Sequence, residues 1–133
     1  MHETTTAPPS LVCSRAFAAT LMQAREARRF LAAILDGRRG ADDAVLCLSE
    51  LAANATIHSH SRRPGGHFTV RAEMRGDRLR VEVHDEGGPW IWPQREDAWR
   101  GRGLLIVSKL ARTWGRIGDS ATGWTVWFDM ESP

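Results

Sequence analysis

Two short segments with strictly alternating apolar and polar residues constrain the fold of this 133-residue chain most strongly. Apolar residues occupy every second position over 68–75, and the same period returns over 79–84, after the turn Gly76-Asp77. A period of two predicts strands with one buried face, and the short glycine turn predicts an antiparallel hairpin. The buried face of such a hairpin needs a second layer of structure to cover it.

Helical periodicity indicates what forms that second layer. Apolar residues recur near helical spacing over 15–35, including Phe17, and Gly37 and Gly40 are expected to end this helix. Two further helices are expected at 42–58 and 104–111. Two C-terminal strands are expected at 113–118 and 123–130, and an edge strand at 11–15. This order favours an α+β fold, a two-layer α/β sandwich with a mixed, mostly antiparallel sheet and helices on one face.

Length and composition narrow the class of protein. The 133 residues suit one domain, expected over 11–133 behind a flexible tail at 1–10. The chain has no apolar run of membrane-spanning length and no secretory signal at its start, so a cytoplasmic protein is expected. A net charge of +2 without a long basic stretch speaks against direct nucleic-acid binding.

The helix expected over 42–58 carries two separate stripes. One is apolar, and the other consists of Glu50, Asn54 and His58 at successive four-residue steps. A Glu and an Asn at this spacing usually mark a solvated helix face. Small alanines around them would let a ligand approach closely, and an Asn oxygen beside a Glu suits Mg²⁺ and proton transfer. A packed or capping role fits His58 better than metal binding, since no partner ligand stands at ligand spacing.

Asp85 continues the buried period of the second hairpin strand. A carboxylate at that position needs hydrogen-bond donors, because burying it without them costs several kcal/mol. Two interpretations fit the residue: an aspartate that caps the turn at Gly87-Gly88, or an acceptor for the exocyclic amine of adenine.

The segment from Gly87 to Arg102 has no clean periodicity, and an irregular stretch of this length often forms a functional lid. It ends in Gly101-Arg102-Gly103-Leu104, which opens a helix. Glycines at a helix N-terminus allow phosphate to approach free N–H groups, although an ordinary loop-to-helix turn has the same pattern.

Taken in order, these segments resemble the nucleotide-binding boxes of the GHKL ATPase superfamily. The run from Ser49 to Ala55 resembles its N box, the run from Asp85 to Gly88 its G1 box, and the run from Gly101 to Leu104 its G2 box. Within the superfamily the likeness is closest to the small bacterial anti-sigma-factor serine/threonine-protein kinases, and it covers roughly 15–130.

The resemblance implies a Bergerat-type ATP-binding fold and a role for each matching residue. Glu50 would be the catalytic base, Asn54 the Mg²⁺ ligand, and Asp85 the adenine acceptor. The residues implied to contact ATP are Asn54, Asp85, Gly87, Gly101, Arg102, Gly103, Leu104 and Thr125. Two positions depart from the family pattern: Pro89 replaces a spaced glycine, and Trp124 stands where a small or basic residue is common.

The function that this resemblance implies is an ATP- and Mg²⁺-dependent serine/threonine kinase that acts as an anti-sigma factor. Its expected partners are a sigma factor and a small antagonist protein that it phosphorylates, and homodimers are expected too. Arg25, Arg28 and Arg29 on the first helix fit a partner surface or a solvated face equally well. The alternative is a catalytically weak nucleotide-binding module that sequesters a regulatory partner, which Glu50 disfavours and Pro89 favours. A detached histidine-kinase domain fits less well, and so does a domain without ligand.

Overall fold

The computed structural model describes residues 10–58, 63–88 and 103–131. The eight helices and strands in these ranges are β1 (Ser10–Ala18), α1 (Leu21–Ile34), α2 (Ala41–His58), β2 (His67–Arg75), β3 (Arg78–His84), α3 (Gly103–Leu110), β4 (Thr113–Asp119) and β5 (Gly123–Glu131). Residues 1–9 of the tail expected at 1–10 lie outside these ranges, and so do residues 89–102 of the possible lid expected from Gly87 to Arg102. No described helix is long and apolar enough to cross a membrane.

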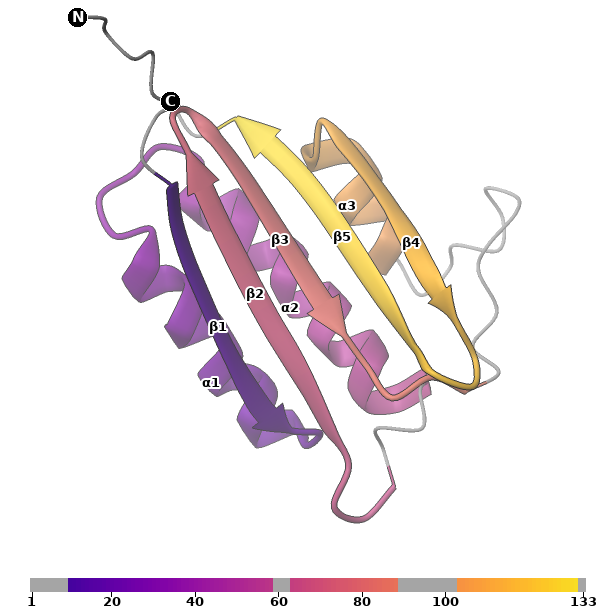
Figure 1. The fold of residues 1–133 in the computed structure, drawn as a ribbon. Coiled ribbons are helices and arrows are strands. Elements are labelled where there is room, and N and C mark those ends of the chain that lie inside the picture. The colour runs from indigo at the N-terminus through magenta and orange to yellow at the C-terminus, as the bar shows by residue number, and fades with distance from the viewer. Residues whose placement is uncertain (1–9, 59–62, 89–102, 132–133) are drawn as a thin grey trace, which may run out of the picture.

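The described strands form one sheet in the order β1-β2-β3-β5-β4, and all three described helices lie on one of its faces (Figure 1). This arrangement confirms the expected two-layer α+β sandwich. All four strand pairs are antiparallel, where the sequence suggested a mixed sheet. The helix α3 connects β3 to β4 at the sheet edge, and β5 then returns between these two strands.

The hairpin of β2 and β3 has the period-two pattern that the sequence predicts. Val70, Ala72, Val81 and Val83 are buried on the face that the helices cover. The apolar stripe of α2 packs over this face and is buried as well; it consists of Leu48, Leu51, Ala52 and Ala55. Burial of each large aliphatic side chain contributes about 1.5–3 kcal/mol, so this contact between two layers is the main source of stability.

The start of α1 differs from the sequence prediction. Phe17 lies in β1 rather than in the helix, and its ring stacks on Phe68 of β2 with 5.6 Å between the ring centroids. The helix begins after Thr20, whose Oγ1 accepts a hydrogen bond from the Gln23 N–H at 3.1 Å. An N-cap of this kind ends the preceding extended segment, and helical spacing alone could not reveal that Phe17 pairs with another strand.

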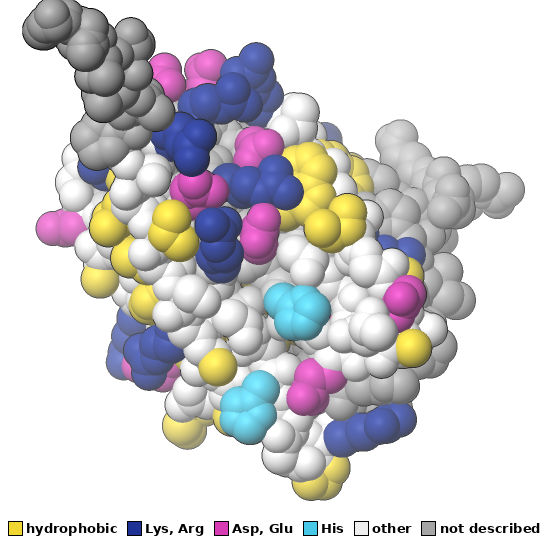
Figure 2. Space-filling view, in the orientation of Figure 1, with side chains coloured by type: hydrophobic (Ala, Val, Ile, Leu, Met, Phe, Trp, Pro, Cys, Tyr) yellow, Lys and Arg dark blue, Asp and Glu magenta, His cyan; other side chains and the backbone are white. Residues whose placement is uncertain are grey.

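The sheet face away from the helices carries charged residues of both signs, and Figure 2 shows them side by side. Arg80 contacts Glu82 at 2.9 Å and Asp129 at 3.4 Å, and its guanidinium lies 4.2 Å from the centroid of the Trp127 ring. Such exposed pairs contribute little to stability. The contact between Arg80 and Trp127 shows, however, that Trp127 on β5 faces away from the helix layer.

Candidate functional site

Asp85 directly follows β3 and is the only charged side chain that is buried within the described parts of the chain, with 2% of its surface exposed. Its N–H donates to the Trp124 carbonyl at 2.9 Å, which extends the pairing of β3 with β5 by one residue. Because successive strand residues face opposite sides, Asp85 shares the inward face with Val81 and Val83. The strand period thus places a carboxylate against the helix layer.

One oxygen of this carboxylate is fully engaged by the protein. Oδ1 accepts the N–H of Gly87 at 2.7 Å and the N–H of Trp124 at 3.1 Å. Within the described residues, no donor reaches Oδ2. A buried acceptor without a donor is costly, so Oδ2 is available to a ligand that brings an N–H or O–H group. The turn-capping interpretation of Asp85 thus matches the contacts of Oδ1, and the role of Oδ2 as a ligand acceptor remains a prediction.

Burial raises the pKa of Asp85 above its ordinary value. The N–H groups of Gly87 and Trp124 lower the pKa again, and the charges of His84 and Arg116 act in the same direction. The pKa of Arg116 is itself lowered by burial, while the Asp85 charge raises it. Burial is the larger cause, so the pKa of Asp85 stays above its ordinary value, and the donors offset part of this rise.

The turn after Asp85 is held tightly against the β4–β5 turn. Gly87 has φ of +88°, and a Cβ atom there would overlap the Ser120 carbonyl oxygen. The N–H of Gly88 donates to the same oxygen at 2.8 Å. Only glycine fits such a close backbone approach in this conformation. The structure thus gives Gly87 a shaping role in the turn, and its expected contact with ATP remains a prediction.

Glu50 and Asn54 lie one turn apart on α2, away from its buried stripe, and both are half-buried. The helix packs against both β3 and α3. Figure 1 shows the C-terminal part of α2 at the same end of the sheet as the end of β3. The charge of Glu50 also affects its own helix: the pKa of the Cys47 thiol is raised to about 12 by burial first, and then by the charges of Asp43 and Glu50.

The glycine-rich start of α3 is partly described. Gly103 opens the helix, whereas Gly101 and Arg102 lie outside the described residues. The Leu104 side chain is buried in the core, so a ligand contact of this residue would have to come from its backbone N–H. Figure 1 shows that α3 begins toward the end of the sheet where β3 ends. A helix N-terminus in that place can accept an anion.

Thr125 lies on the face of β5 opposite to that of Asp85, so its expected contact with ATP remains a prediction. Its Oγ1 lies 2.9 Å from Nδ1 of His84, and these two residues pair across β5 and β3 on the face away from the helices. The inward position next to Asp85 belongs to Trp124, whose Nε1 donates to the Gly88 carbonyl at 3.1 Å. Both faces of β5 are apolar in sequence, so periodicity alone could not assign them.

Sequence reasoning also missed Arg116 of β4, whose guanidinium lies 3.7 Å from the centroid of the Trp124 ring. The register of β4 with β5 pairs Arg116 with Val126, so this arginine shares the inward face with Trp124. The alternation of side chains over 113–119 would have identified Arg116 if the core-facing side of β4 had been known from the sequence.

No group of three or more His, Cys, Asp or Glu side chains that could hold a metal occurs in the described segments. A Mg²⁺ ion here would therefore depend on the Asn54 oxygen, phosphate oxygens and water.

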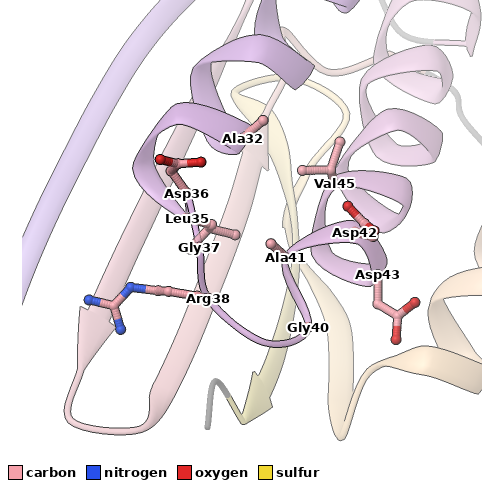
Figure 3. A pocket seen from close by; sticks show the side chains of 10 residues that line it. All are labelled: Ala32, Leu35, Asp36, Gly37, Arg38, Gly40, Ala41, Asp42, Asp43 and Val45. Atoms are coloured by element: carbon pink, nitrogen blue, oxygen red, sulfur yellow. The ribbon is translucent and has the colours of Figure 1, made fainter.

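A separate pocket lies at the α1–α2 connection, where Figure 3 shows Arg38 extending away from Asp42 and Asp43. This pocket is at the other end of the sheet: Gly40 approaches Glu131, and Glu131 pairs with Arg78 at the start of β3.

Comparison with known proteins identifies the family of this chain and relates its fold to a solved structure. The model of the histidine kinase-like ATPase domain family matches residues 17–130. The described fold is similar to a solved structure of the RsbU and RsbW domains of Rv1364c from Mycobacterium tuberculosis, with a TM-score of 0.72 and 22% identity. The alignment covers 93% of this chain and 32% of the solved chain, so this chain spans about a third of that protein. No curated protein matches in sequence.

Proposed function

This chain belongs to the histidine kinase-like ATPase domain family, and on that basis we propose that it is an ATP- and Mg²⁺-dependent protein serine/threonine kinase that acts as an anti-sigma factor. One observation carries the nucleotide part of the proposal. The buried Asp85 has one oxygen saturated by backbone donors, and the described residues offer no donor to its other oxygen. The exocyclic amine of adenine is a donor of the required kind.

Glu50 and Asn54 account for phosphotransfer. The Asn54 oxygen would hold Mg²⁺, which would neutralise charge on the phosphates of ATP. Glu50 accepts the proton of the attacking serine or threonine hydroxyl. The hydroxyl oxygen then forms a bond to the γ-phosphorus, the bond between this phosphorus and the β–γ bridging oxygen breaks, and ADP leaves. The half-burial of both side chains on one helix face supports this division of roles.

The phosphates are held by the start of α3. Gly103 opens this helix, and the free N–H groups of its first turn can bind an anion. Gly101 and Arg102, which lie outside the described residues, are further predicted phosphate contacts. Gly87 keeps the turn after Asp85 in the shape that leaves room for the base.

The phosphoryl acceptor in this proposal is a small antagonist protein, and the second partner is a sigma factor. The exposed side chains of Arg25 and Arg28 on α1 provide a basic surface for an acidic partner. Arg29 next to them is paired with Glu26 at 3.0 Å, so it contributes less net charge. Homodimer formation is part of the same proposal.

The experiment that tests the proposal combines the protein with labelled ATP, Mg²⁺ and candidate antagonist proteins encoded beside it. Label on a serine or threonine of one candidate supports the kinase. A protein that binds ATP and a partner but transfers no phosphate would instead be a sequestering nucleotide-binding module. A protein that binds no ATP would refute both functions.

A further inference from the structure

Trp124 makes two hydrogen bonds with Asp85 and a third with the turn that follows it. Its N–H donates to Asp85 Oδ1 at 3.1 Å, and its carbonyl accepts the Asp85 N–H at 2.9 Å. Its indole Nε1 donates to the Gly88 carbonyl at 3.1 Å. The first two contacts need only a backbone, and any residue could make them. The third contact needs a side-chain donor, which the indole N–H supplies here.

The indole ring itself is held in place on one of its faces. The Arg116 guanidinium lies 3.7 Å from the ring centroid, which is within the range of a cation–π contact. A ring held on its face keeps the direction of its N–H fixed, so the hydrogen bond to Gly88 does not depend on a freely rotating side chain.

With the indole in place, hydrogen bonds hold three successive polar groups of the turn after Asp85. The Gly87 N–H is bound to the carboxylate, the Gly88 N–H to Ser120, and the Gly88 carbonyl to Trp124. Loss of the last tie would leave a buried carbonyl without its donor. The turn would then relax, and the Gly87 N–H and the carboxylate that it orients would move with it.

We propose that the Trp124 indole is a positioning residue for Asp85: by holding the Gly88 carbonyl it fixes the turn that keeps Oδ1 on the protein and presents Oδ2 to a purine amine. The inference rests on the proposed nucleotide function and extends it to a side chain that does not touch the amine. The effect of Trp124 on binding should therefore depend on the presence of that amine.

Trp124→Phe is the variant that tests this dependence. Phenylalanine keeps an aromatic face for Arg116 and both backbone contacts with Asp85. It removes the indole N–H together with part of the ring volume. The matched control is Trp127→Phe on the same strand, because Arg80 lies over that ring in the same way on the opposite face of the sheet.

The measurement compares ATP with purine riboside triphosphate, which lacks the 6-amino group, by calorimetry at fixed Mg²⁺. The wild-type protein should prefer ATP by roughly tenfold or more, the value of one hydrogen bond to a charged group. Trp124→Phe should reduce this preference at least threefold and leave the affinity for purine riboside triphosphate within about twofold. Trp127→Phe should keep the wild-type preference.

Hydrogen exchange tests the role of the hydrogen bond between Trp124 and Gly88 without any ligand. The Gly88 amide should exchange faster in Trp124→Phe than in the wild-type protein and the control. Unchanged Gly88 exchange overturns the proposal, and so does an ATP preference equal to that of the wild-type protein. Equal weakening of both ligands also overturns it, because that result describes a purely structural tryptophan. A wild-type protein without ATP binding would refute the proposed function itself, and no variant is needed to see that outcome.

Discussion

Asp85→Asn separates the two oxygens of the buried carboxylate. In the wild-type protein Oδ1 accepts two backbone N–H groups, from Gly87 at 2.7 Å and from Trp124 at 3.1 Å. An asparagine can keep both contacts only if its amide oxygen takes the place of Oδ1. Its NH₂ group then takes the place of Oδ2 and faces the adenine amine, so a donor meets a donor.

The size of the effect follows from that reversal. A hydrogen bond to a charged acceptor contributes about 1.5–3 kcal/mol, so its loss should weaken ATP binding roughly tenfold to a hundredfold. Binding of purine riboside triphosphate should change much less, because this ligand has no amine to lose. The fold should survive, since the turn keeps both of its donors.

Calorimetric titration of both proteins with both ligands measures these quantities, and thermal unfolding checks the fold. Asp85→Ala is the matched control, because it removes the turn contacts together with the ligand contact and should lower the melting temperature. An Asp85→Asn protein with wild-type ATP affinity would remove Asp85 from the binding site. A variant as unstable as Asp85→Ala would show that the asparagine does not keep the turn, and the argument about orientation would fail.

Three further variants address catalysis, metal binding and the β4–β5 turn. Glu50→Ala should lower phosphotransfer by about 10²–10⁴-fold and keep ATP affinity within a few-fold; transfer at the wild-type rate in a radiolabel assay would contradict its role as base. Asn54→Ala should reduce the tightening of nucleotide binding by Mg²⁺, and an equal Mg²⁺ effect in both proteins would leave Asn54 as a surface amide. The pKa of Asp119 is lowered by donors from Thr122 and Ala121, so its stabilising effect is present above the unfolded pKa and is lost as pH falls through the lower folded value. Asp119→Asn should therefore reduce the melting temperature at neutral pH, with a difference that closes in acid; a constant difference across pH would exclude this cause.

The sequence by itself determined most of the architecture. The period of two over β2 and β3 and the apolar stripe of α2 each require a buried face, so a sheet covered by helices follows from the residues alone. The same period assigned Asp85 to the inward face, because each residue of a strand has its side fixed by its neighbours. The structure confirms that position and finds 2% of the residue exposed.

Tertiary structure decided whatever depends on a partner segment that is distant in sequence. Phe17 fits a helical pattern locally, yet its pairing with Phe68 places it in a strand. Thr125 and Trp124 lie on a strand with two apolar faces, so only the pairing with β3 shows which of them is next to Asp85. Periodicity shows which side chains of a segment are buried and which are exposed. The residues that these side chains contact are set by long-range strand pairing, which no local pattern contains.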